Sequence, residues 1–215
     1  MSEHAAVVDG ESVPVDRVEA LLAAVPARDR AGTRDRQVAR QEALAQAERQ
    51  RRRWATQVVV TDELARRACA ERGLAPPREV SPERVLAVSG TDVADLGSIV
   101  AVALAHSPAA RALLAALENE QRVPEEAVRD YYVRNRDRFL TKDALRRGVD
   151  AFTTAAAGDF QPYERVREEV ARELRRARGR QAFFDWLDRA RAGVAYTAGH
   201  EHPGDPAHPD HEHRH

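Results

Sequence analysis

The residues best suited to chemistry gather at the C-terminal end of the chain, where histidine dominates. Six of the eight histidines fall there: His200, His202, His208, His211, His213 and His215. Imidazole suits nickel, zinc, copper and cobalt, and the acidic residues between these histidines add oxygen ligands. The segment is rich in glycine and proline and has no large apolar side chain. It is therefore predicted to be a disordered chelator that orders on binding metal.

Two other interpretations of this segment stay open. It could be an expression tag, although tags are usually unbroken histidine runs and this one is interrupted by Gly-Asp-Pro and Pro-Asp. It could also be a native end that only keeps the protein in solution. We treat residues 199–215 as a separate tail and its six imidazoles as candidate metal ligands. No cofactor is expected to be required by the rest of the chain.

The rest of the sequence shows no catalytic constellation. It has no Gly-x-Ser-x-Gly, no phosphate-binding glycine loop and no His-Glu-x-x-His. Cys69 is the only cysteine, so no disulfide can form within the chain, and its helical surroundings predict a small buried residue. Adjacent carboxylates such as Glu125 and Glu126 point apart on a helix. We therefore expect no enzyme activity.

Charge and hydropathy exclude further classes of function. Thirty-four basic residues nearly balance thirty-five acidic ones, so net charge gives no case for nucleic acid as the main partner. The most apolar stretch, residues 99–105, is too short to span a bilayer, and residues 1–10 show no secretory signal. The expectation is a cytoplasmic chain with neither a membrane nor a nucleic-acid partner.

The expected elements are mainly helical. Helical periodicity and capping residues predict helices over residues 17–25, 33–59, 61–73, 99–105, 109–121 and 162–192, and another that opens at Pro124. Residues 99–105 and 109–121 are expected to form either two helices in series or one helix interrupted near Pro108. Asp16 and Thr61 are the expected N-caps of the helices over residues 17–25 and 61–73. The Asp9-Gly10 turn between two β-prone runs predicts an N-terminal hairpin. Because a lone hairpin is marginal in water, residues 194–197 are expected to join it as a third strand.

Three segments resemble parts of one family. The opening Val8–Val15 reads as strand, turn, strand and then helix. Val123–Phe139 contains Tyr-Tyr-x-x-Asn-x-x-x-Phe, and Pro162 through Leu187 forms one long helical pattern. Together they resemble the chaperone part of the SurA, PpiD and PrsA family of parvulin-associated chaperones. In that family the second segment ends the N-terminal chaperone domain and the third matches the C-terminal helix.

The catalytic part of that family has no counterpart here. A parvulin domain usually lies between the second and third segments, whereas residues 140–161 are too few for its sheet and helices and contain no histidine. The resemblance implies a mainly α, SurA N-terminal-domain-like chaperone fold with a small β-sheet near the chain ends. It would span residues 1–198, with residues 139–161 as a linker in place of the parvulin domain.

The resemblance implies a non-catalytic chaperone or assembly factor that holds a client protein. The alternative is a metallochaperone that delivers a divalent metal to a metalloenzyme subunit through the tail, and the two roles can be combined. A homodimer is compatible with either role.

The client-binding residues are not assigned by the sequence. Tyr131, Tyr132 and Phe139 are aromatic candidates, although packing of a domain junction is the more ordinary use of such residues. Phe183, Phe184 and Trp186 cannot all face one core, so one of them is a candidate for contact with a partner.

Overall fold

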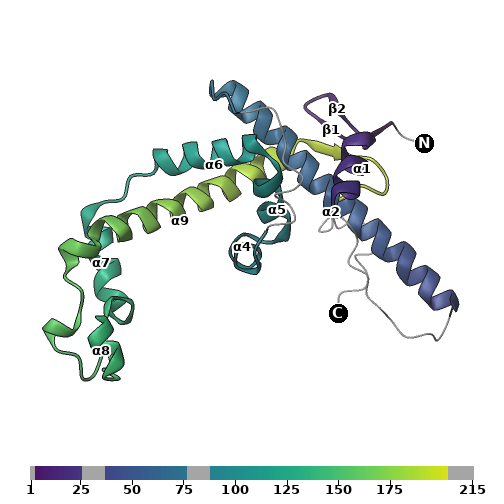
Figure 1. Ribbon diagram of the computed structural model, residues 1–215. Coiled ribbons are helices and arrows are strands. Elements are labelled where there is room, and N and C mark those ends of the chain that lie inside the picture. Colours follow the sequence, from purple (N-terminus) through teal and green to yellow (C-terminus); the bar gives the residue numbers. More distant parts are fainter. Residues whose placement is uncertain (1–2, 26–36, 77–87, 203–215) are drawn as a thin grey trace. The chain divides into compact units, whose positions relative to one another are not determined.

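A computed structural model describes residues 3–25, 37–76 and 88–202, with side chains in the second range described from residue 44 onward. Helices make up most of these residues, as expected, and a small antiparallel sheet accompanies them (Figure 1). The chain divides into two compact units. The first is Met1–Leu113 with Asp185–His215, and the second is Leu114–Phe184.

The first unit holds all three strands and the N-terminal helices. Its elements are β1 (His4–Val8), β2 (Glu11–Pro14), α1 (Val15–Ala24), α2 (Gln37–Glu71), α4 (Gly90–Leu96), α5 (Ser98–His106) and β3 (Val194–Tyr196). The second unit holds α7 (Glu125–Arg134), the 3-10 helix η1 (Arg136–Phe139), α8 (Lys142–Arg146) and the 3-10 helix η2 (Ala157–Asp159). Two helices, α6 (Pro108–Glu120) and α9 (Tyr163–Arg191), run from one unit into the other.

The sheet joins the two ends of the chain. Its strand order is β2-β1-β3, and β1 pairs antiparallel with both neighbours, including Val8 opposite Val194 (Figure 1). Asp9 and Gly10 both have positive φ, which is the conformation of the tight turn expected there. The predicted hairpin and the predicted third strand are therefore both confirmed.

Helix α2 supplies the core on which the sheet and α1 pack. Val58, Val59 and Val60 are consecutive and all fully buried, so the helix has neighbours all round at this level. These neighbours are β1, α1 and α5. Three buried valines in a row place apolar side chains on more than one face of the helix, because a helix enclosed on every side needs no polar face.

The helix predicted over residues 61–73 is not separate from the helix before it. Residues 33–59 and 61–73 were expected to form two helices with Thr61 as a cap, but α2 is continuous from Gln37 to Glu71. Thr61 lies inside it, and its hydroxyl donates to the carbonyl of Gln57 at 2.7 Å. A threonine can satisfy itself in this way within a helix as well as at a cap. Residues 33–36 lie outside the described residues.

The cap expected at Asp16 is also wrong. Helix α1 begins at Val15, directly after Pro14, and Asp16 lies in its first turn without capping a backbone group. An acidic residue in the first turn still interacts favourably with the helix dipole. Ser89, by contrast, does cap α4, and it forms a reciprocal capping box with Asp92.

An arginine ties the hairpin to α2. Arg67 donates to the carbonyl oxygen of Val8 at 2.8 Å and pairs with Glu11 at 2.9 Å and Glu63 at 3.2 Å. The side chain therefore joins the end of β1, the start of β2 and the neighbouring turn of α2. Exposed ion pairs of this kind contribute little individually, but the bond to a backbone carbonyl also fixes the hairpin's position.

The second unit has two small cores. In the first, Val128 and Phe139 pack against Val166 and Val170 of α9, with Tyr131, Tyr132 and Tyr163 around them. The second core lies within the expected linker and contains Leu140, Ala144, Ala151 and Phe160. An antiparallel bridge between Leu140 and Phe160 closes the segment at its base. The residues between Phe139 and Gln161 are thus a small folded insertion.

Two helices approach very closely inside the second unit. Gly179 of α9 is buried, and a Cβ atom added there would lie 2.8 Å from the Cα of Glu118 in α6. Backbone cannot yield as a flexible side chain can, so this position requires glycine. Along α9 the buried apolar side chains are Val166, Val170, Phe183 and Leu187, so Phe183 is the one of the three neighbouring aromatic residues that is fully buried.

We predict that Gly179→Ala lowers the free energy of unfolding by about 1–2 kcal/mol. Overpacking costs about 1–3 kcal/mol, and the better helix propensity of alanine returns up to about 1 kcal/mol. Urea denaturation measures the change. The matched control is Gly90→Ala in α4, where the added Cβ meets nothing within 4 Å and should be neutral or stabilising. Equal stability of the two variants would contradict the close approach.

Candidate functional site

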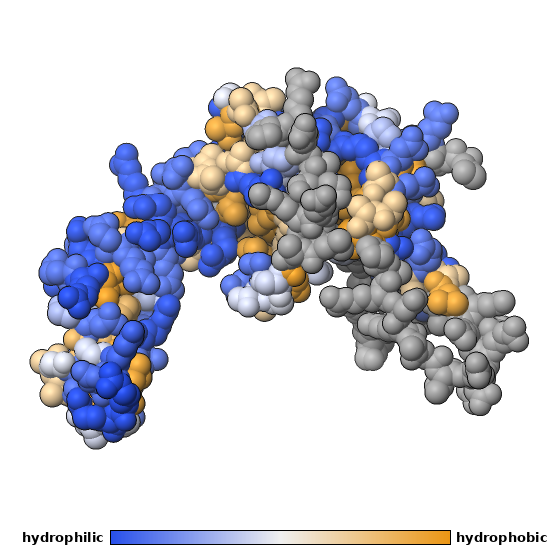
Figure 2. All heavy atoms as spheres, in the orientation of Figure 1, coloured by the Kyte–Doolittle hydropathy of each residue, from blue (hydrophilic) through white to orange (hydrophobic). Residues whose placement is uncertain are grey.

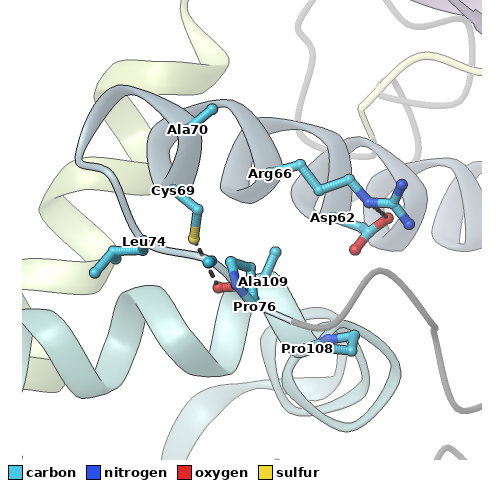
Figure 3. A pocket seen from close by; sticks show the side chains of 9 residues that line it. Asp62, Arg66, Cys69, Ala70, Leu74, Pro76, Pro108 and Ala109 are labelled. Carbon is cyan, nitrogen blue, oxygen red and sulfur yellow. Dashed lines mark hydrogen bonds and ion pairs between the residues drawn. The ribbon is translucent and has the colours of Figure 1, made fainter.

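An apolar hollow in the first unit lies along the C-terminal half of α2. It has a volume of about 460 Å³. Cys69 and Ala70 of α2, Leu74 and Pro76 after it, and Ala109 of α6 form much of its wall (Figure 3). Asp62 and Arg66 lie at one end. A mostly apolar hollow with charged groups at one end has the composition of a binding groove.

Cys69 is a structural part of this groove. Its side chain is buried, as expected, and its thiol donates to the carbonyl of Ala109 at 3.4 Å (Figure 3). Burial raises the pKa of the thiol, and nearby Arg72 opposes this only partly. Because the thiolate is the reactive form, the groove is not built around a nucleophile.

The buried carboxylate of Asp62 pairs with two arginines in this region. The Asp62 side chain is 1% exposed, and its Oδ2 accepts from Arg17 at 2.8 Å and from Arg66 at 2.9 Å. Its Oδ1 has no hydrogen-bond partner among the described residues. A buried acceptor left unpaired costs about 1–3 kcal/mol. Sequence reasoning missed this residue because, beside Thr61, it resembled an ordinary first-turn acid.

Glu63 reinforces the same arrangement from the next position. It accepts from Arg17 at 2.7 Å, so Arg17 of α1 bridges two consecutive acidic residues of α2. Burial disfavours its charged form, but Arg17 and Arg67 outweigh that effect and hold the pKa of Glu63 below its usual value. Arg17 thus joins α1 to α2 through two neighbouring carboxylates.

His106 lies near Asp62 at the end of α5. It is 7% exposed, and its Nδ1 has no hydrogen-bond partner within the described ranges. Burial lowers the pKa of His106, Arg17 and Arg66 add to the effect, and Asp62 opposes it. The imidazole is therefore neutral at pH 7. The signal in the sequence was a lone histidine at the end of an apolar helix.

The tail divides between described and undescribed residues. His208, His211, His213 and His215 lie outside the described residues. His200 is only 7% exposed, and its Nδ1 is 2.7 Å from the hydroxyl of Thr56 in α2. The first residues of the expected tail, Gly199 to Glu201, therefore pack against α2.

The Thr56 hydroxyl lies between two neighbours. Its oxygen is 3.0 Å from the carbonyl oxygen of Arg52 and 2.7 Å from Nδ1 of His200. In the tautomer that carries the proton on Nδ1, the lone pair of the ring is on Nε2. Metal-bound histidines commonly donate their other ring N–H to such a partner. No group of three or more potential ligands is assembled among residues 3–25, 37–76 and 88–202.

The aromatic candidates are used in packing. The rings of Tyr132 and Phe139 lie 4.9 Å apart between centroids, and Phe139 belongs to the core of the second unit. The hydroxyl of Tyr131 donates to Glu173 and that of Tyr132 donates to the carbonyl of Gln161. This agrees with the packing interpretation. Phe183 is buried, while Phe184 and Trp186 are half-buried.

Apolar surface is distributed differently over the two units. Figure 2 shows blue surface over most of the second unit, with small orange patches near α7 and α8, and broader orange areas on this face of the first unit. In the described part of the chain, no single helix has the length and apolarity to cross a membrane. Only the pair α5–α6, bent by 105°, passes such a test jointly.

Comparison with known proteins identifies no relative. No protein-family profile matches the sequence, and neither a curated protein nor a solved structure does.

We predict that the contact of His200 with α2 weakens as pH falls. Burial, with Arg52, lowers the pKa of His200 below its usual value near 6.5, and Glu201 only partly offsets this. An undocked His200 therefore binds protons more readily than the docked one, so docking is complete above about pH 6.5 and is lost progressively below it.

Hydrogen exchange measures this loss at the His200 amide, which donates to the Thr197 carbonyl at 2.9 Å. Protection, corrected for intrinsic rates, should be lower at pH 5 than at pH 8. The variant Thr56→Val keeps the side-chain shape, removes the hydroxyl and should reduce protection at both pH values. Unchanged protection in the original chain between pH 8 and pH 5 would contradict the prediction.

Proposed function

We propose that this chain is a non-catalytic chaperone or assembly factor that holds an apolar segment of a client protein. The carrying observation is the groove of about 460 Å³ along α2, with its apolar walls and its charged end. Apolar walls bind different sequences with similar affinity, and a charged end orients what they hold.

The sequence supports the same proposal. The opening hairpin, the Tyr-Tyr segment and the long C-terminal helix are the three places that resemble the chaperone part of the SurA, PpiD and PrsA family. The insertion between Phe139 and Gln161 stands where that family carries its parvulin domain. It contains two short helices and a four-residue core, and we therefore propose that prolyl isomerisation is absent.

We predict that the full chain slows aggregation of an unfolding client protein without ATP. Light scattering of citrate synthase at elevated temperature measures this. Ala70→Gln places a polar side chain in the groove from an exposed helical position, and should weaken client binding by about fivefold, which corresponds to about 1 kcal/mol.

The matched control is Ala47→Gln, at an exposed position of the same helix that does not line the groove. It should protect the client as well as the original chain does. Failure of the original chain to slow aggregation at molar excess with several clients would remove the general form of the proposal. Equal protection by both variants would show that the client is held elsewhere.

A second candidate function is delivery of a divalent metal to a client metalloenzyme. The specific observation favouring it is the contact of His200 Nδ1 with the Thr56 hydroxyl at 2.7 Å, because a hydroxyl oxygen can accept the Nδ1 proton when Nε2 binds a metal. The high density of histidines in residues 200–215 also supports this function. Nickel, zinc, copper and cobalt all suit this ligand set.

We predict that the full chain binds nickel or zinc mainly through the last four histidines. Calorimetry should show binding by the full chain and a large loss when His208, His211, His213 and His215 are replaced together by Gln. Binding should weaken below about pH 6, because a histidine must be neutral to coordinate. Circular dichroism of the variant should be unchanged. Equal uptake by the two chains, or uptake by neither, would remove the metal-delivery function.

A further inference from the structure

Three arginines follow one another along a single face of α9 in the second unit. Arg172, Arg176 and Arg180 are spaced four residues apart, so their side chains lie on the same side of the helix. Together with Glu169 and Glu173 they line a polar hollow of about 320 Å³. We call the three arginines the arginine row.

The two acidic residues of the hollow do not neutralise the arginine row. Glu173 is bound by residues outside it: its carboxylate accepts from Arg138 at 2.7 Å and 3.1 Å and from the Tyr131 hydroxyl at 2.8 Å. Glu169 is exposed to solvent. Among residues 3–25, 37–76 and 88–202, no carboxylate forms an ion pair with a guanidinium of the row.

The row therefore carries positive charge without compensation. Like charges four residues apart on a helix repel each other, and the row contains two such pairs. By contrast, Arg138 pairs with Glu173 and Arg167 pairs with Glu125 in the same unit. The sequence adds to the excess, because residues 172–180 contain five arginines and one glutamate. A surface of this kind is complementary to an anion.

The spacing of the row matches an extended acidic polypeptide. Guanidinium groups bind carboxylates through two parallel hydrogen bonds. A helix rises about 1.5 Å per residue, so successive arginines of the row are about 6 Å apart along the helix axis. Alternate side chains of an extended polypeptide point to the same side and are about 6.6 Å apart. Carboxylates at alternate positions can therefore meet successive arginines.

Glu169 favours a polypeptide over a nucleic acid as the partner. It lines the hollow at one end of the row, where its charge would repel a continuous phosphate backbone. A polypeptide has backbone N–H groups between its carboxylates, and Glu169 can accept a hydrogen bond from one of them. The nearly balanced charge of the whole chain also gives no support to a nucleic-acid partner.

We propose that the arginine row binds an acidic segment of a partner protein that carries Asp or Glu at alternate positions. The hollow at the row shares no residue with the groove along α2. The inference therefore goes beyond the proposed client-holding function, and each of the two can fail without the other.

Three peptides test the charge and its spacing. The probe is fluorescein-labelled Gly-Ser-Glu-Ser-Glu-Ser-Glu-Ser-Gly, the second peptide has Gln in place of each Glu, and the third has its three Glu residues consecutive. Fluorescence anisotropy with the full chain at low salt, where screening is weak, should show binding of the probe. The Gln peptide should bind at least tenfold more weakly, and the consecutive peptide about threefold more weakly.

Two double variants test the position. Arg172→Gln with Arg176→Gln removes two charges of the row, keeps residues that favour a helix, and should weaken binding of the probe at least tenfold. The matched control is Arg165→Gln with Arg189→Gln, which removes the same charge from exposed positions of α9 that do not line the hollow. It should bind the probe within about twofold of the original chain. Circular dichroism checks that both variants are folded.

Several results would overturn the proposal. They are no binding of the probe by the original chain, equal affinity for the probe and either of the other peptides, and an equal loss of affinity in the two double variants. A labelled oligonucleotide of thymidines tests the alternative partner. If the oligonucleotide binds more tightly than the probe, and Arg172→Gln with Arg176→Gln abolishes that binding, the row is a nucleic-acid site and the proposal is wrong.

Discussion

Pairing of β1 on both edges is the constraint on which the first unit depends. With β2 alone, β1 would form a two-stranded hairpin, which is marginal in water. The second partner, β3, comes from the far end of the chain, after α9. Closing so long a loop costs only slightly more than closing a short one, because the entropic cost grows with the logarithm of length. Burial of Val8 and Val13 together with the valines of α2 offsets that cost.

The same packing creates the buried charge of Asp62. Helix α2 is enclosed where β1, α1 and α5 pack against it. Asp62 lies two positions after Val60 and is therefore buried together with the valines of the same helical turn. Arg17 and Arg66 compensate one of its oxygens. A buried pair of this kind is weak evidence for stability, since its desolvation is costly.

Particular residues show how far the sequence predicted the fold. The turn at Asp9-Gly10 requires a conformation that few other dipeptides adopt, so the hairpin could be predicted locally. Thr61 could cap a helix or bond within one, and only the surrounding valine core decides between these, so the boundary was misplaced. For the candidate site, the histidine-rich tail could be recognised in the sequence from its amino-acid composition. The groove was not visible, because it combines α2 with Pro108 and Ala109, almost forty residues after Cys69.

By itself the sequence determined the helical content, the hairpin, the third strand and the absence of a disulfide within the chain. Each of these depends on local periodicity, turn chemistry or a count of residue types. Tertiary structure alone decided that Val58, Val59 and Val60 are all buried, that Gly179 lies against Glu118, and that residues 140–160 fold around their own small core. It also decided that Asp62 and His106 line one hollow. These features depend on contacts between segments that are distant in sequence, and the type of a single residue does not indicate which residues will be its neighbours in space.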